Sequence, residues 1–483
     1  MPQAAAQQGL NNLWLCGYDD GWGLPWGGTD LEFVSGSLDI SQVDRDIDFG
    51  RSAANITDAQ GSILFSTNGI YVANATGATM QNGTYLNPSY YTFSHPYGLH
   101  ISQSHLILPR PEHPDIYYLI HGTIDDDVLG TAYYLYLTTI DMDLDNGLGG
   151  VVAKNEVLIE DALNVGKITA VRHANGRDWW VFCHKAYTNV FHRLLVTPQG
   201  VQVDGSQSIG ITRSMDLGQV CFSPDGSKFA YYWGVEDLEI FSFDRCTGLF
   251  ADPVHIPIDD TNTMGGVAFS PNGRYLYVSS VMDVYQFDTE APSIAASMVH
   301  IAHWDGFYSP SPPFATGFDI AQLAPDGKVY IATGNGTFHL HVVHDPDQPG
   351  FACNMEQHGV ELPTYYMNSL PNHPNYHLGP VVGSVCDSLA LTANSTLTPG
   401  EGPGVRVYPN PSNGQFNLSY PVQPEAGLLE VLDIQGRVVY HSRLAAWSQV
   451  HAVGLEGEAA GMYHCRLRWG AQAASTRIII TEP

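Results

Sequence analysis

The chain has 483 residues and a formal net charge of −29, from 49 aspartates and glutamates against 20 lysines and arginines. Binding to a nucleic-acid backbone requires a basic face, so this balance argues against nucleic acid as a partner. No segment approaches the ~20 consecutive apolar residues that cross a bilayer, and we expect no transmembrane segment. The first 15 residues lack the basic and apolar regions of a signal peptide, so none is visible.

Residues 13–34 are dense in tryptophan and glycine. Trp14, Trp22 and Trp26 could form a platform for carbohydrate, because aromatic faces stack on sugars as they do on each other. The same rings could instead pack beneath a neighbouring sheet. Both interpretations stay open.

Six stretches between residues 53 and 345 repeat one pattern of short apolar runs and tight turns. Alternating apolar and polar residues bounded by Asp, Asn, Pro and Gly predict short antiparallel strands. The stretches are residues 53–72, 104–137, 168–196, 218–244, 265–288 and 318–345. Their turn glycines include Gly176, Gly226, Gly273 and Gly327, which recur 50, 47 and 54 residues apart. Such a repeat, with several strands per unit, is typical of a β-propeller.

The sequence therefore predicts an all-β fold with a β-propeller over residues 1–390. A sheet of three or four strands cannot bury both faces alone, and a ring of such sheets gives each one two neighbours. Six to seven blades are expected, and seven are favoured. The seventh blade would consist of residues 13–34 and a strand near residues 381–386.

Asp141, Asp143 and Asp145 stand at alternate positions in a predicted loop. This is the carboxylate spacing of a calcium loop, although the glycine comes one position late and Val152 stands where such loops carry a glutamate. A turn between strands explains the pattern as well. No cofactor is required, and calcium is possible at this loop.

Two other groups could carry chemistry. His339 and His341 lie on one side of a predicted strand and could bind a transition metal, or could be ordinary surface histidines. Asp319 and Asp326 could be catalytic carboxylates at a propeller mouth, although Asp326 is first of all a turn residue. No nucleophile elbow, phosphate-binding loop, His-Glu-x-x-His or Cys-x-x-Cys motif occurs. We therefore predict no catalytic residue, and we lean against an enzyme.

The chain has seven cysteines, so at least one cannot be in an intramolecular disulfide. In an exported protein, Cys353 and Cys386 are the expected bridge, because they bracket an irregular, proline-rich segment. Cys221 with Cys246 is a second candidate.

The composition changes after Cys386. Residues 391–404 are small, polar and interrupted by Pro and Gly, which predicts a flexible linker. Residues 405–483 contain a set of short alternating strands, with a hairpin around residues 435–436. About 80 residues of this kind predict a small β-sandwich.

This last region resembles a known family, the type A C-terminal sorting domain of the type IX secretion system of Bacteroidota. The residues that carry the resemblance are Tyr408, Pro409, Asn410, Pro411, Gly414, Asp433, Gly436, Gly461 and Tyr463. The resemblance implies that the type IX machinery passes the folded passenger through the outer membrane, and that the sorting domain is then often removed. The family commonly has lysines in its last strand, whereas this chain has Arg477.

The propeller region resembles uncharacterised WD40-like proteins that precede such sorting domains. Residues 61–69, 167–173, 222–226 and 370–376 carry this resemblance, which implies a fold and a location and no activity.

We expect a secreted or outer-membrane surface protein whose propeller binds an extracellular protein or glycan, as a binding or adhesion module. One alternative is a propeller hydrolase or lyase acting on polysaccharide or peptide. A second is a structural surface-layer or gliding-associated component.

Overall fold

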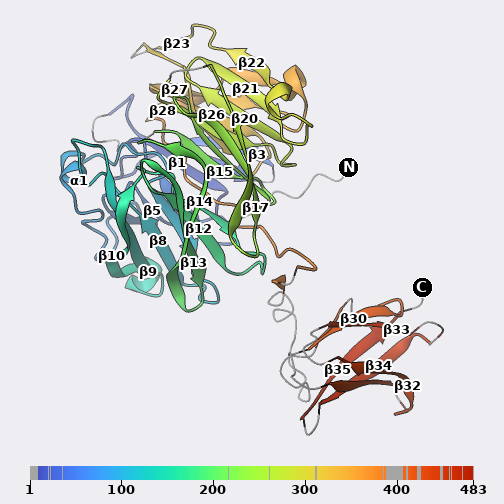
Figure 1. Cartoon of the computed structure of the whole chain (residues 1–483). Coiled ribbons are helices and arrows are strands. Elements are labelled where there is room, and N and C mark those ends of the chain that lie inside the picture. Colours follow the sequence, from blue (N-terminus) through green and yellow to red (C-terminus); the bar gives the residue numbers. More distant parts are fainter. Residues whose placement is uncertain are drawn as a thin grey trace. The chain divides into compact units, whose positions relative to one another are not determined.

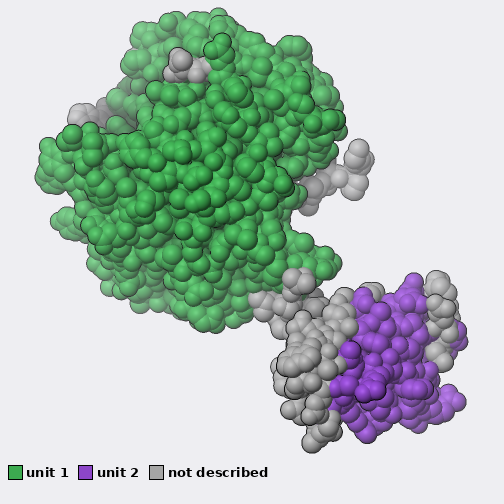
Figure 2. All heavy atoms as spheres, viewed as in Figure 1, with its two compact units in different colours: residues 1–390 green, residues 391–483 purple. Residues whose placement is uncertain are grey.

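The computed structural model describes residues 9–387 except 20, 22, 35, 216, 260–261, 311–312 and 385. It also describes residues 406–481 except 409–411, 421–425, 434, 446–449, 456, 458 and 470–471. The chain divides into two compact units, residues 1–390 and 391–483, which Figure 2 colours separately. The predicted linker, residues 391–404, lies outside the described residues. No helix in the described ranges is both long enough and apolar enough to cross a membrane.

The first unit contains seven successive antiparallel sheets in its described part, named blades A to G here (Figure 1). Blade A is β1 (Leu13–Gly17), β2 (Gly28–Val34) and β3 (Ser37–Val43), and blade B is β4 (Ala54–Thr57), β5 (Ile63–Thr67) and β6 (Val72–Asn74). Blade C is β7 (His105–Pro109), β8 (Ile116–His121), β9 (Ala132–Asp141) and β10 (Gly150–Leu163). Blade D is β11 (Thr169–Arg172), β12 (Trp179–His184), β13 (Thr188–Thr197) and β14 (Gly200–Arg213).

The remaining three blades have four strands each. Blade E is β15 (Gln219–Phe222), β16 (Lys228–Trp233), β17 (Asp237–Asp244) and β18 (Leu249–Ile256). Blade F is β19 (Gly265–Phe269), β20 (Tyr275–Ser280), β21 (Asp283–Asp288) and β22 (Val299–His303). Blade G is β25 (Phe318–Leu323), β26 (Val329–Thr333), β27 (Gly336–Val343) and β28 (Met355–Met367). Outside the blades lie the two-stranded ladder β23 (Tyr308–Ser309) and β24 (Phe314–Ala315), and the helix α1 (Tyr90–Ser94).

The apolar clusters show that the seven sheets form a closed ring. Each cluster spans neighbouring blades, since a thin sheet must bury both faces against others. Leu13 of blade A packs with Ala73 of blade B, and one large cluster joins blades B, C and D. Further clusters join D with E, E with F, and F with G. The last cluster brings Trp14 of blade A onto Tyr330 of blade G, so the predicted seven-bladed propeller is confirmed.

The repeated turns are as predicted. The glycines of four of them have φ of +71°, +72°, +70° and +81°, the left-handed region that favours glycine (Gly176, Gly226, Gly273, Gly327). In blade E the Asp225 carboxylate accepts hydrogen bonds from the Ser223 hydroxyl (2.6 Å) and the Ser227 N–H (3.0 Å). Each turn thus folds on its own side chains, which is why the sequence alone located it.

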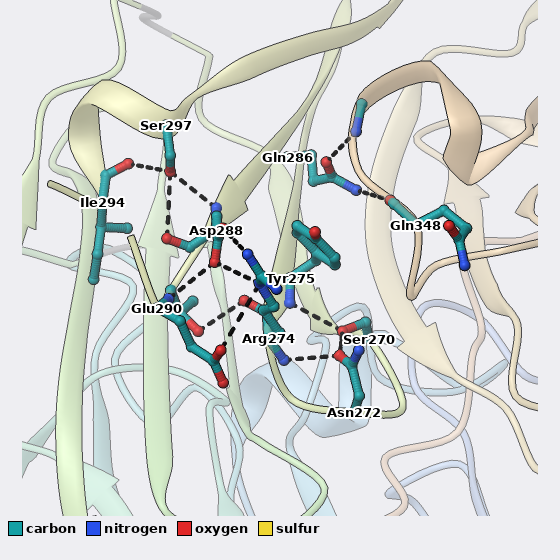
Figure 3. A network of polar contacts seen from close by, with 12 residues as sticks. Ser270, Asn272, Arg274, Tyr275, Gln286, Asp288, Glu290, Ile294, Ser297 and Gln348 are labelled. Atoms are coloured by element: carbon teal, nitrogen blue, oxygen red, sulfur yellow. Dashed lines mark hydrogen bonds and ion pairs between the residues drawn. The ribbon is translucent and has the colours of Figure 1, made fainter. Parts of the chain in front are cut away.

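The same turn in blade F is also tied to a strand end (Figure 3). Asn272 accepts from the Ser270 hydroxyl at 2.7 Å and from the Arg274 N–H at 2.9 Å. The Arg274 guanidinium reaches Asp288 at the end of β21, with Nη2 to Oδ2 at 2.7 Å. The Asp288 N–H in turn donates to the Ser297 hydroxyl at 2.9 Å.

The ring closes differently from the prediction at one point. Residues 369–373, and not residues 381–386, run beside β4: Ala53 forms a parallel bridge with Pro371, and the Asn372 N–H donates to Ala53 O at 3.3 Å. The Cys16 thiol of β1 donates to Ser369 O at 3.5 Å. Pro371 and Pro374 kept this extended segment from being predicted as a strand, since proline has no N–H for a ladder.

The proline-rich segment before it is also more regular than expected. Residues 362–363 lie inside β28, which pairs only with β27 in blade G. Proline is tolerated in an edge strand because its missing N–H faces no partner.

The predicted disulfide is wrong. Cys386 pairs with Cys246, with their Cα atoms 5.6 Å apart, while Cys353 and Cys221 take part in no disulfide. Cys353 is fully buried in the core between blades F and G. Cys246 lies in the turn between β17 and β18, and only the return of the last part of the propeller region to this blade brings Cys386 near it.

The second unit is the predicted β-sandwich. One sheet is β29 (Arg406–Tyr408), β30 (Gln415–Ser419) and β33 (Val450–Gly454); the other is β32 (Val438–Leu444), β31 (Gly427–Leu432), β34 (Gly461–Trp469) and β35 (Gln472–Ile480). Their inward residues form one separate core, which includes Phe416, Leu429 and Leu467.

The residues that carry the family resemblance mark its turns and strand starts. Tyr408 ends β29, Gly414 has φ +101° just before β30, and Gly461 begins β34. The Asp433 carboxylate accepts from the N–H groups of residues 435 and 437 at 2.9 Å each, while Gly436 adopts φ +79°. The Tyr463 hydroxyl donates to Ala459 O at 2.7 Å. Pro409, Asn410 and Pro411 lie outside the described residues.

Candidate binding site at the propeller axis

The innermost strands of the blades face one another across the propeller axis. Their inner edges carry backbone N–H and C=O groups without ladder partners, and such groups need other partners when buried. The side chain of Gln219, which begins β15, binds three of these backbone groups. Its Oε1 accepts from the N–H groups of Val267 (3.0 Å) and Ala321 (2.9 Å), and its Nε2 donates to Ala321 O at 2.7 Å. One buried side chain thus joins the innermost strands of blades E, F and G.

Two further amides, Gln103 and Asn372, bind backbone groups on the other side of the axis. Gln103 binds the backbone of Val220 through both Oε1 (3.0 Å) and Nε2 (2.9 Å), and also reaches Asn372 Oδ1 at 3.3 Å. Asn372 Nδ2 donates to His105 O at 3.1 Å and to Ile168 O at 2.8 Å. Neutral side-chain amides therefore link the innermost strands of different blades around the axis.

Beside these amides, at the ends of the innermost strands, lies a cavity of about 1110 Å³. It exceeds the ~300–1,000 Å³ usual for small-molecule pockets. Its walls combine small apolar residues of β11, β15, β19 and β25 with amides and turn prolines. The lining includes Ala170, Val220, Val267, Ala268, Gln322, Ala324, Asn11, Asn372, Asn375, Pro224, Pro271 and Pro325.

The described lining contains one carboxylate, one imidazole and one thiol: Asp326, His373 and Cys221. Asp326 accepts from the Lys328 N–H at 3.1 Å and the Tyr330 hydroxyl at 2.8 Å, as a turn residue. Burial lowers the pKa of His373 to about 4, so the ring is neutral and its Nε2 donates to Asn55 O at 2.8 Å. Burial also raises the pKa of Cys221 to about 12, which keeps it a thiol. The described lining of the cavity offers hydrogen bonds and apolar contact.

The carboxyls whose pKa values are raised most lie outside this described lining. Asp319, at the start of β25, is fully buried and accepts from Asn368 Nδ2 at 2.6 Å. Burial raises its pKa to about 7, against the opposing effect of Arg51. Burial, with the nearby Asp19 carboxylate, raises the pKa of Asp48 to about 6, although Asp48 accepts from the Asp19 N–H at 3.0 Å. The described residues thus include two carboxyls with pKa values near neutrality, Asp319 and Asp48.

The predicted calcium ligands do not converge. Asp141 ends β9 and its Oδ1 accepts from the Asp143 N–H at 3.0 Å, which is a turn contact, while Asp143 and Asp145 are exposed. Among the described residues, Asp283, His300 and His303 are the only set of three or more His, Cys, Asp or Glu side chains with ligand atoms within 4.8 Å of one another. Calcium at Asp141, Asp143 and Asp145 stays a prediction.

The histidine pair on β27 lies among packed side chains. His339 Nδ1 is 3.2 Å from the Ser309 hydroxyl, and His341 Nδ1 accepts from the His358 N–H at 2.9 Å. Complete burial lowers the pKa of His341 to about 3. Both rings serve the core of blade G, and the structure does not join them in a metal-binding group.

Two of the three tryptophans pack inside the protein. Trp14 is buried against Phe33 and Tyr330, so it forms no carbohydrate platform. Trp26 is half-buried between Tyr18 and Tyr365. Trp22 lies outside the described residues.

Sequence reasoning missed the axial amides Gln103, Gln219 and Asn372. Isolated glutamines and asparagines form no motif, and their role depends on strands that lie up to 269 residues away in the chain. The group of Asp283, His300 and His303 was missed as well.

Residues 406–481 match the secretion system C-terminal sorting domain. Among curated proteins, none matches the chain. Solved structures with similar folds include a protein from Lactobacillus plantarum (13% identity, TM-score 0.42, covering 75% of this chain and 98% of that one). Another is a putative 6-phosphogluconolactonase from Bacteroides fragilis (11%, TM-score 0.43, 74% and 97%). A third is Chaetomium thermophilum Sqt1 bound to the N-terminus of ribosomal protein L10 (14%, TM-score 0.36, 70% and 84%). The ring of blades and the match over residues 406–481 together describe a β-propeller followed by a C-terminal sorting domain of the type IX secretion system, which makes the chain a secreted or cell-surface protein.

Proposed function

We propose that this protein is an exported binding or adhesion module whose ligand enters the axial cavity. The cavity itself carries the proposal: it is large, and the carboxylate and imidazole in its described lining already bind protein groups. A site with neutral donors and acceptors and no activated group is suited to holding a ligand.

The ligand class follows from the lining. Apolar walls suit the carbon faces of a ligand. The NH2 groups of Gln322 and Asn375 each use one N–H on a backbone carbonyl (His373 O at 3.3 Å, Pro224 O at 2.8 Å) and have a second N–H to offer an uncharged acceptor. An extracellular glycan or a protein segment offers both. The turn pattern supports a WD40-like passenger of Bacteroidota, held at the outer-membrane surface or released.

The test is to screen the full chain on a glycan array and a peptide library, and then to measure affinity for the best ligand by calorimetry. Gln322→Trp fills the cavity from β25, and we expect at least a tenfold loss of affinity. Gln207→Trp is the matched control, because Gln207 lies on β14, away from the cavity, and is half-buried like Gln322. Equal effects of the two variants, or none from Gln322→Trp, would contradict a ligand in the cavity.

A hydrolase or lyase acting on polysaccharide or peptide is the second candidate. Its support is that two separate carboxyls, Asp319 and Asp48, have pKa values of about 7 and about 6, since an acid or a base that works near neutrality needs such a value. The full chain would be assayed against a substrate panel with Asp319→Asn beside it. Turnover that Asp319→Asn abolishes would establish the enzyme, and its absence across the panel would leave the binding module.

A further inference from the structure

Three metal-ligand side chains meet on the outer strands of blade F, away from the axis. Asp283 begins β21, and His300 and His303 lie on the outermost strand, β22. His300 Nε2 and His303 Nδ1 are each 2.7 Å from the same atom, Asp283 Oδ1. The imidazoles are 51% and 61% exposed and the carboxylate 21%, so an ion in solution can reach all three.

A β-bulge creates this arrangement. Residues three apart on a regular strand point to opposite faces. Here His303 pairs with Asp283, Ala302 with Val284 and His300 with Tyr285, so Ile301 is an extra residue without a partner. Ile301 is buried, while His300 and His303 are both exposed on one face. Bulges commonly re-aim side chains in this way, and without this one the two imidazoles would not share a carboxylate.

Blade E shows the same position without the second histidine. Asp237 begins β17 as Asp283 begins β21, and Asp237 Oδ2 is 3.0 Å from Nε2 of His255 on the outer strand β18. Its other oxygen accepts from the Ile258 N–H at 3.0 Å. The backbone thus provides in blade E the contact that His303 provides in blade F, and among the described residues blade F alone has three such ligands.

We propose that Asp283, His300 and His303 form a zinc-binding site. Bonds of about 2.0–2.2 Å to nitrogen and oxygen place neighbouring ligand atoms of a tetrahedral zinc ion about 3.3 Å apart. The three ligand atoms lie within 4.8 Å of one another on exposed side chains, so small rotations bring them to that spacing. On binding zinc, His300 Nε2 and His303 Nδ1 would each offer a lone pair to the ion, and the proton of each ring would sit on its other nitrogen.

The donor set favours zinc over calcium, because calcium takes six to eight oxygen ligands, whereas imidazole suits zinc and other late transition metals. Three protein ligands leave one tetrahedral position open for water or for a donor group from outside the protein. The net charge of −29 raises the local concentration of cations around the chain.

The test uses untagged full-length protein, since a histidine tag binds the same ions. Calorimetric titration with Zn²⁺ should give one saturable site, and Co²⁺ should report the coordination through its d–d absorption. His303→Ala and Asp283→Asn should each weaken Zn²⁺ binding at least tenfold and remove the Co²⁺ signal.

His255→Ala in blade E is the matched control and should change the Zn²⁺ affinity less than twofold. Circular dichroism of every variant tests whether it is folded. Unchanged affinity in a folded His303→Ala, an equal loss in His255→Ala, or no saturable site in the parent protein would overturn the proposal. A Ca²⁺ titration tests the Asp141–Asp145 loop separately, and binding there does not depend on His303.

Discussion

At the scale of single residues, burial decides which acidic and basic groups can do chemistry. Asp319 and Asp326 looked alike in the sequence, as two aspartates in one repeat. In the fold Asp326 caps its own turn and contacts Tyr330, whereas Asp319 is fully enclosed and bound by Asn368. The sequence could place Asp326 because its partners are local, but Asp319 depends on residues from other strands.

The buried Asp319 makes stability depend on pH. Its pKa is raised from 3.8 to about 7, so between these values the folded protein keeps a proton that the unfolded chain loses. Its contribution to the free energy of unfolding therefore falls as pH rises from about 4 to about 7, by about 4 kcal/mol. Asp319→Asn removes this dependence, so the variant should gain stability relative to the parent protein over that range. Urea unfolding at pH 4, 5.5 and 8 measures it.

Asp39→Asn, at an exposed position of β3, is the control for this measurement and should show a constant difference from the parent protein. A difference for Asp319→Asn that is the same at all three pH values would contradict a neutral, buried Asp319.

At the scale of elements, local chemistry fixes the turns, and long-range contacts fix the edges of the strands. The Ser-Pro-Asp-Gly and Ser-Pro-Asn-Gly turns could be predicted because Asp225 and Asn272 bind the backbone N–H of Ser227 and Arg274 in their own turns. Figure 3 shows the second of these turns. The bulge in β22 could not be predicted, because register is set by the pairing with β21 and by the core that receives Ile301. The group of Asp283, His300 and His303 depends on that register, so it could not be predicted from the sequence either.

The innermost strands depend on Gln219 for their unpaired backbone groups. Gln219→Leu keeps the volume but leaves the N–H groups of Val267 and Ala321 and the Ala321 carbonyl without this partner. Each buried unsatisfied group costs about 1–3 kcal/mol, so we expect a loss of at least ~3 kcal/mol in the free energy of unfolding.

Gln207→Leu is the comparison for Gln219→Leu. Gln207 also binds the backbone of a neighbouring blade, through Phe250 N–H (2.9 Å) and O (2.7 Å), but it is only half-buried and water can replace it. A loss below ~1 kcal/mol is expected there. Equal losses in chemical denaturation would refute the special role of the axis.

At the scale of the whole molecule, the two ends of the propeller region hold the ring together. Blade A comes from the N-terminal side, and residues 369–373 run beside β4 from the other side. Further along, Cys386 is linked to blade E. The repeats can be predicted from the sequence, but the closing segment lies about ten residues earlier than predicted, and Cys386 pairs with Cys246 instead of Cys353.

The disulfide is expected to stabilise the ring by restricting the unfolded chain. It links residues 140 positions apart, and loops of this length correspond to about 5 kcal/mol in the chain-entropy model, with ~2–5 kcal/mol usual in practice. Cys246→Ser should lower the free energy of unfolding by ~2–5 kcal/mol. A reducing agent should then cause no further loss of stability in this variant. Peptide mapping of the parent protein should find Cys246 linked to Cys386. A Cys353–Cys386 peptide would contradict the structure.

The sorting domain has a core of its own, so its removal tests delivery apart from folding. Deletion of residues 405–483 should leave a folded propeller in the periplasm, detected by cell fractionation and protease resistance. Export of the truncated protein into the medium would contradict delivery by this domain.

The sequence by itself determined the all-β class, the repeated turns, the sandwich and its sorting signature. These features are encoded within short stretches, where alternation and turn residues act on their immediate neighbours. Only the tertiary structure decided the closing segment beside β4, the Cys246–Cys386 bridge, the amides at the axis and the histidines that the bulge aligns. Each of these requires residues that are distant in the chain to meet, and their positions are set by how the blades pack around the axis.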